Sequence, residues 1–274
     1  MRIIWAVVVA GLLGTSAASA GPIALASHRA GYEITLGGAN TDHRATTNAP
    51  VSASGVIAYE FRGSSCEGYT SNFRQLTQLQ RAEGGTIASD INAVSFEDAQ
   101  AKSLRFEITS QSGEEAQPGV SGSAERADDG AIGVDLVKPG KEKVALGQNV
   151  LFPTQHIEQI IATARGGGRV LEARVFDGSD TGKKVYSTLA IIGLERKSAS
   201  ADSEIAPRLA DTARWPVTIS YFNEANKDAP PDYTMTFDLY ENGVSGSLKL
   251  DYGSFALSAK LKKLDWLPES RCAK

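Results

Sequence analysis

The sequence is poor in cysteine, histidine and net positive charge, and each scarcity argues against a class of protein. Two cysteines in 274 residues are too few for a scaffold framed by many disulfides. With 28 Lys and Arg against 32 Asp and Glu, the formal charge is −4, which argues against a nucleic-acid binder. Three histidines leave little room for histidine-based catalysis. The length nevertheless allows a sizeable core without metals or many cross-links.

The first twenty residues have the pattern of a secretory signal peptide. Arg2 supplies the positive start, residues 3–13 form an apolar run, and Ala18-Ser19-Ala20 supplies a small-residue cleavage site. The apolar run is shorter than the roughly 20 residues that a membrane-spanning helix needs, so we do not expect an integral membrane protein. We predict a signal peptide over residues 1–20 and a single exported domain over residues 21–274.

Export changes the interpretation of Cys66 and Cys272. In an oxidising compartment, an isolated pair of cysteines is typical of a disulfide. Two thiols buried apart, or pairing between two chains, are the alternatives that this reasoning leaves open. An intramolecular bridge would tie the C-terminal tail to the first part of the domain.

Alternating apolar and polar residues predict that most of the chain forms β-strands. Tyr32, Ile34 and Leu36 alternate with Glu33 and Thr35, so one face of this strand would turn inward and the other toward water. The same period of two residues is found at 57–61, 104–108, 132–136, 171–175 and 217–221. Half-solvated strands with short connections are typical of antiparallel sheets.

Residues 233–261 predict a three-stranded meander in the C-terminal region. Glu241-Asn242-Gly243 has the composition of a hairpin turn between the first two of these strands. The alternation changes phase between Leu261 and Leu264, which predicts a β-bulge at the two lysines that separate them.

One segment has the period of a helix instead. Pro153 suits the first turn of a helix, apolar residues follow at helical spacing, and Gly166 to Gly168 would end it. We predict one amphipathic helix from about Pro153 to Arg165. Such a helix can cover the open face of a curved sheet, which must bury its apolar side.

Linear motifs for catalysis or metal binding are weak or missing. Asp180-Thr181-Gly182 is the tripeptide of aspartic proteases, but that mechanism needs two carboxylates sharing a proton, and the chain holds no second copy. Its glycine-rich setting favours a turn. His28, His43 and His156 show no metal-ligand spacing. We therefore predict no catalytic residue, no metal site and no cofactor, although the fold could still bring carboxylates together.

Three short motifs occur in order along the chain: HRAGY at 28–32, GSSCEGY at 63–69 and FPTQH at 152–156. With Cys272 near the C-terminus, they resemble the envelope integrity protein B family, periplasmic proteins of Gram-negative bacteria. The resemblance implies a mainly β fold, a strongly curved antiparallel sheet of spiral or half-barrel form with one helix on its concave face, similar to the carriers LolA and LolB. It also implies a disulfide between Cys66 and Cys272.

The same resemblance implies a role in maintaining the cell envelope, without an established chemical activity. Our first hypothesis is a non-catalytic periplasmic protein that binds an envelope component or another periplasmic protein. A carrier of lipid or lipoprotein is one alternative, and an envelope hydrolase with carboxylates assembled by the fold is another. The sequence does not indicate which residues would bind the ligand.

Overall fold

The computed structural model describes residues 23–37, 49–197, 205–226, 228–269 and 272. The expected signal peptide at 1–20 and His43 lie outside these ranges. Within them the chain is mainly β, as the alternating pattern predicts, and its sixteen strands belong to one sheet.

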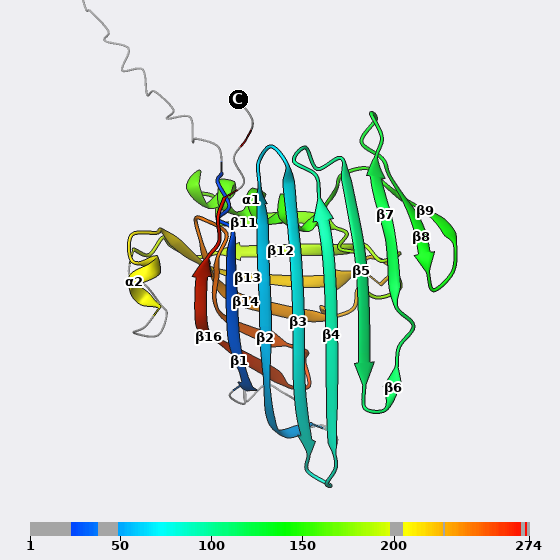
Figure 1. Ribbon diagram of the computed structural model, residues 1–274, viewed down its shortest axis with the longest axis vertical. Coiled ribbons are helices and arrows are strands. Elements are labelled where there is room, and N and C mark those ends of the chain that lie inside the picture. Colours follow the sequence, from blue (N-terminus) through cyan, green and yellow to red (C-terminus); the bar gives the residue numbers. More distant parts are fainter. Residues whose placement is uncertain (1–22, 38–48, 198–204, 227, 270–271, 273–274) are drawn as a thin grey trace, which may run out of the picture.

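The strands lie in two layers that cross each other (Figure 1). The front layer runs lengthwise and contains β1 (His28–Leu36), β2 (Pro50–Ser64), β3 (Gly68–Arg81), β4 (Thr86–Glu97), β5 (Ser103–Ser112), β7 (Val120–Arg126), β8 (Ile132–Lys138) and β9 (Glu142–Gly147). The second layer runs across behind it and contains β11 (Val170–Val175), β12 (Tyr186–Ile192), β13 (Arg214–Asn223) and β14 (Tyr233–Tyr240). The layers are joined by β15 (Ser245–Asp251) and β16 (Ala256–Trp266), because β16 pairs with both β15 and β1.

The two ends of this sheet approach each other, so the fold is nearly closed and barrel-like. The strand order is β10-β11-β12-β13-β14-β15-β16-β1-β2-β3-β4-β5-β7-β8-β9, and β6 (Glu115–Ala116) pairs with β5. Every pair is antiparallel except that of β11 with β10 (Val150–Leu151), the short strand that follows β9. Arg174 on β11 donates hydrogen bonds to the carbonyl oxygens of Leu146 and Gln148, at 3.3 and 2.6 Å. These hydrogen bonds link β11, next to one end of the sheet, to β9 and the residues that follow it at the other end.

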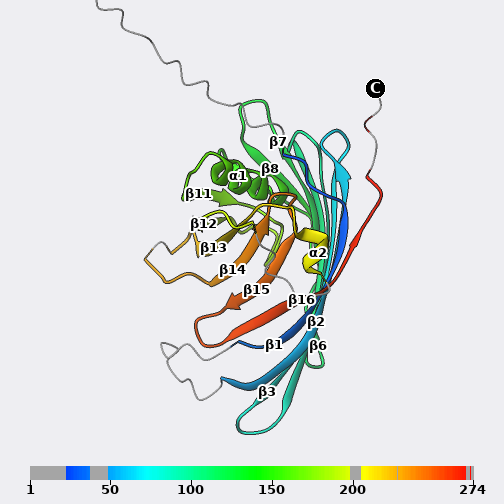
Figure 2. The ribbon, with the colours of Figure 1, turned by 90° about the vertical axis from the view of Figure 1, so that its left-hand side faces the viewer.

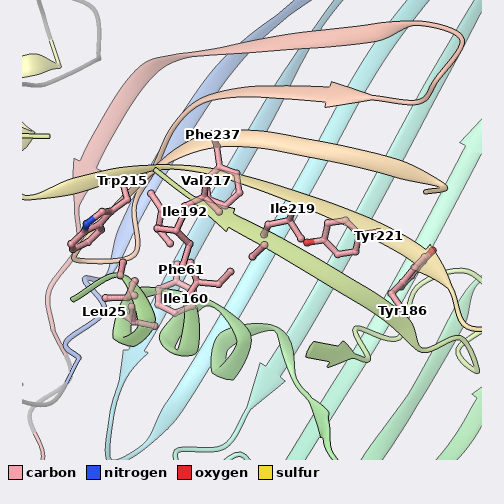
Figure 3. Packing of buried hydrophobic residues seen from close by; sticks show 14 of the residues in the cluster. Leu25, Phe61, Ile160, Tyr186, Ile192, Trp215, Val217, Ile219, Tyr221 and Phe237 are labelled. Carbon is pink, nitrogen blue, oxygen red and sulfur yellow. The ribbon is translucent and has the colours of Figure 1, made fainter. Parts of the chain in front are cut away.

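The core lies between the layers, and α1 (Pro153–Arg165) closes one end of it (Figure 2). The inner face of α1 buries Ile160 and Ile161. They pack against Phe61 of the front layer and against Ile192 and Trp215 of the second layer (Figure 3). Burying one aliphatic side chain of this size is worth roughly 1.5–3 kcal/mol, so α1 holds the two layers together.

The predicted local features are confirmed. The helix has the expected bounds, and Gly243 adopts a left-handed φ of 84° in the turn between β14 and β15. Along the β1–β16 pair, Gly31 lies opposite Lys263 but Tyr32 lies opposite Leu261. One residue of β16, Lys262, is therefore extra, which is the bulge that the change of phase predicts.

The structure adds two features to the prediction. A second helix, α2 (Ala206–Leu209), is only four residues long, too short to show a helical period in the sequence. β3 and β4 are long strands with many polar residues, so alternation does not mark them clearly. Among the described residues, no helix is long and apolar enough to cross a membrane.

Candidate functional site

A pocket of about 100 Å³ lies inside the curved sheet, between α1 and the inner face of β2 to β4. Residues of the sheet form one wall, and the first two turns of α1 form the other. The lining residues are Leu25, Tyr59, Phe61, Ser71, Ser95, Pro153, Thr154, Ile157 and Gly243. The lining is mostly apolar, with a few hydroxyl groups, which is the composition of sites that hold small apolar groups.

Two larger hollows lie on the outer face of the sheet, and neither has an apolar, enclosed lining. One of about 330 Å³ lies over Gly31 and Ala58, neighbours in the β1–β2 pair whose small side chains leave the sheet surface uncovered. Another of about 580 Å³ surrounds the ion pair of Arg174 with Glu224. Both are open and bordered by charged side chains, so the pocket beneath α1 is the better candidate for an apolar ligand.

Aromatic rings form the sheet wall of the pocket. Phe61 stacks on Tyr69 with ring centres 5.0 Å apart, and Tyr59 lies 5.7 Å from the ring of His28. Burial raises the pKa of the Tyr59 hydroxyl, although a hydrogen bond with Ser71 acts in the opposite direction. This wall is therefore aromatic and uncharged, and its hydroxyls serve as hydrogen-bonding groups.

A buried carboxylate from β4 fixes the helix wall. The residue before α1, Phe152, provides no side-chain cap. Instead, the two carboxylate oxygens of Glu97 accept hydrogen bonds from the backbone N–H groups of Thr154 and Gln155, at 2.7 and 3.0 Å. These are donors that the first turn of a helix leaves without an intrahelical partner. Glu97 thus ties the pocket's helix to the front layer.

Burial dominates the electrostatics of Glu97. It raises the pKa of this carboxyl group to about 7; the two helix N–H groups lower it, and the nearby carboxylate of Glu158 raises it further. Arg126 extends beside the same turn, donating to the carbonyl of Val150 at 2.9 Å and to the side chain of Gln155 at 3.2 Å. The first turn of α1 is therefore held from two strands, β4 and β7.

At the end of this first turn, His156 is buried and neutral. Its Nε2 lies 3.4 Å from the hydroxyl of Thr188 on β12, and burial lowers the pKa of the imidazole to about 4. Since this side chain faces the second layer, it packs α1 against the sheet and does not line the pocket.

Glu97 and His156 predict opposite effects of pH on stability. Because the folded pKa of Glu97 is raised, the folded state binds more protons between pH 4.5 and 7, and this group's contribution to the free energy of unfolding falls as pH rises. For His156 the unfolded state binds more protons between pH 4 and 6.5, so its contribution rises with pH. The two contributions oppose each other in wild type.

We therefore expect a Glu97→Gln variant to lose stability more steeply than wild type when the pH falls from 6.5 to 4. The variant keeps the acid-sensitive His156 and lacks the carboxyl group that offsets it. Urea denaturation at a series of pH values measures this slope. Parallel profiles for the two proteins would contradict the assignment.

A second aromatic cluster extends along the second layer. Tyr221 and Tyr233 are opposite each other in the β13–β14 pair and stack with ring centres 4.4 Å apart. Tyr186 joins them at one side, and Tyr252 and Phe255 continue the series at the other. Burial raises the pKa of every one of these tyrosines. Exposure increases from Tyr186, which is buried, to Tyr252, which is exposed.

The cysteines lie away from the pocket, at the surface. The structure joins Cys66, in the turn between β2 and β3, to Cys272, with Cα atoms 5.8 Å apart. The bridge fastens the segment after β16 to the β2–β3 turn. Neither cysteine lines the pocket.

The structure does not assemble the weak catalytic motif into a site. Asp180 lies in the loop between β11 and β12 and is 3.5 Å from Lys184, within a turn as its glycine-rich setting predicts. Among the described residues, no group of three or more His, Cys, Asp or Glu side chains could hold a metal ion. Sequence reasoning missed Glu97, because no linear signal distinguishes it from other acidic residues at strand ends.

These features define a class: barrel-like β-proteins whose curved sheet holds a helix and an apolar pocket on its inner side. The EipB-like family model matches residues 19–268, so the chain belongs to the EipB-like family. The chain is 34% identical to the cell envelope integrity protein EipB of Brucella abortus (strain 2308) over 258 residues, 93% of this chain and 89% of that protein.

The fold is also similar to a crystal structure from Brucella abortus, described as a beta-barrel-like protein of a domain of unknown function, DUF1849. The TM-score is 0.80 at 33% identity, and the match covers 90% of this chain and all of that one. The name of the relative EipB supports a role in cell-envelope integrity, and the crystal structure supports the barrel-like fold.

Proposed function

We propose that the protein supports envelope integrity as a non-catalytic periplasmic binding protein, which holds an apolar part of an envelope component between α1 and the sheet. The observation that carries the proposal is the pocket beneath α1, because it lies inside the fold and has an aromatic, uncharged wall. The signal peptide expected at residues 1–20 supports export of the single domain over 21–274.

The inner face of the sheet is also apolar beyond the pocket. Apolar side chains there are only partly buried, including Phe73 and Leu79 of the front layer and Leu248 and Leu250 of β15. Their partial exposure leaves apolar surface accessible on this face. An apolar chain longer than the pocket itself could therefore extend along this face.

The geometry favours binding over hydrolysis. A hydrolase with two working carboxylates needs oxygens that face the substrate. Glu97, the buried carboxylate nearest to the pocket's helix wall, uses both oxygens to accept N–H groups of α1. Its role is to position the helix, which is what a binding site requires.

The first test is the identity of whatever copurifies with the protein. We expect organic extraction of protein prepared without detergent to release an acylated envelope component, detected by mass spectrometry. After this extraction, the protein should bind a fluorescent fatty acid, and binding should raise the melting temperature, since a ligand that binds only the folded state stabilises it. No extracted acyl compound together with no binding of the probe would contradict the proposal.

A pair of variants locates the site. Ser95→Leu adds bulk to the pocket wall on β4 and should weaken binding of the fatty acid by about tenfold or more, because the added side chain occupies the ligand's space. Ser54→Leu makes the same change on β2, at an exposed position outside this pocket, and should leave binding unchanged. Equal affinities for both variants would place the ligand elsewhere.

A further inference from the structure

Three exposed aliphatic residues occur where β11 begins and just beyond the end of β12. Val170 and Ile191 lie opposite each other in the β11–β12 pair and are 54% and 47% exposed. Leu194, two residues beyond β12, is 71% exposed, the largest value among the exposed large hydrophobic residues that the structure describes. Isolated exposed aliphatic residues are ordinary, but a cluster of them marks a contact surface.

Basic side chains border this cluster. Arg169 precedes β11 and donates a hydrogen bond to the carbonyl of Gly193, beside Leu194. Arg196 and Lys197 follow directly in the same exposed stretch. The basic groups thus flank the aliphatic residues on both strands from which those residues come.

Basic residues outnumber acidic residues around the cluster. The acidic residues next to it in sequence are Glu172 and Glu195, against three basic residues, so this area is net positive on a chain whose formal charge is −4. Neighbouring outward positions on β12 to β14 carry one ion pair, Arg214 with Asp238. The others named here are uncharged: Ser187, Leu189, Thr218, Ser220, Thr234 and Thr236.

We propose that this membrane-docking surface, formed by Arg169, Val170, Ile191, Leu194, Arg196 and Lys197, holds the protein against an anionic phospholipid membrane. The aliphatic side chains enter the boundary between headgroups and acyl chains, while the basic groups meet lipid phosphates. Each contribution is small by itself, and stable attachment needs both. The docking does not depend on a ligand in the pocket beneath α1.

Charge distinguishes this surface from the other exposed aliphatic pair. Val56 and Leu76 also lie opposite each other and face outward, on β2 and β3. There, however, Asp90 lies opposite Leu76 on the next strand and forms an ion pair with Arg74. The Arg74–Asp90 pair leaves no net charge beside these aliphatic residues, whereas the three basic residues beside the docking surface outnumber Glu172 and Glu195 and complement an anionic membrane.

Flotation with lipid vesicles tests the proposal on the exported, disulfide-bonded protein. We expect binding to vesicles of phosphatidylethanolamine and phosphatidylglycerol, and weaker binding to phosphatidylcholine vesicles. Leu194→Glu and Ile191→Glu should each reduce partitioning by about tenfold, because each places a charge where an aliphatic side chain enters the membrane. An Arg196→Glu/Lys197→Glu variant should abolish the preference for anionic vesicles.

Val56→Glu is the matched control, since Val56 is 50% exposed in an equivalent cross-strand pair. It should bind vesicles like wild type, and circular dichroism should show that all variants fold. The pocket variant Ser95→Leu should also bind vesicles normally, which separates this inference from the proposed function. Equal losses for Val56→Glu and Leu194→Glu, or no vesicle binding by wild type, would overturn the proposal. A stable dimer that Leu194→Glu dissociates, without vesicle binding, would assign the surface to a second copy instead.

Discussion

A Cys66→Ser/Cys272→Ser double variant is expected to lower the free energy of unfolding by up to about 5 kcal/mol. The two residues are separated by 206 positions in the sequence, so the bridge closes a loop that includes most strands of the sheet. In the chain-entropy description, such a long loop greatly restricts the unfolded chain. Urea denaturation followed by far-ultraviolet circular dichroism measures the change.

The same experiment shows where the effect arises. Since the bridge lies at the surface and outside the pocket, the folded double variant should keep its secondary structure and its affinity for a fatty acid. A Ser64→Ala variant, which keeps the bridge but removes a hydroxyl 3.1 Å from the Cys66 sulfur, serves as the control and should change little. Equal denaturation midpoints for wild type and the double variant would show that the bridge contributes nothing to stability.

Glu97→Ala is expected to lower the free energy of unfolding by about 3 kcal/mol. The substitution leaves the N–H groups of Thr154 and Gln155 without their acceptor, and each buried donor without a partner costs about 1–3 kcal/mol. Above pH 7, where the carboxyl group is ionised, it also removes a negative charge from the positive end of α1. Because α1 forms one wall of the pocket, the variant should bind a fatty acid less tightly than wild type.

Glu107→Ala is the matched control for this prediction. Glu107 lies on β5, is exposed, and pairs with Lys138 at 3.0 Å. Exposed ion pairs contribute about 0–1 kcal/mol, so its loss should hardly change the denaturation midpoint. If Glu97→Ala were no more destabilised than Glu107→Ala, the Glu97 carboxylate would not hold the helix.

Local structure follows closely from sequence where neighbouring residues determine it. Pro153 and the glycines after Arg165 define the bounds of α1, because they act on the backbone of that segment alone. The extra residue at Lys262 is likewise visible, because a two-residue period cannot continue through a bulge.

Contacts between residues that are far apart in the sequence are harder to predict from it. β4 and α1 meet through Glu97 and Thr154, which are 57 positions apart, and nothing near either residue indicates the other. The phase of the alternation shows that Val170 and Ile191 face the same side of their strands, but which side is left exposed depends on the layer packed behind them. The pocket and the docking surface therefore could not be located in advance.

The sequence by itself determined the β-rich composition, the single long helix, the bulge in the last strand and a cysteine pair suited to an oxidising compartment. Each depends on periodicity or residue type within a short stretch, or on composition. Only the tertiary structure decided that the sheet nearly closes, that a β4 carboxylate caps α1, and that an apolar pocket lies between them. Those features arise from contacts between distant segments, whose geometry is fixed only when the two layers pack together.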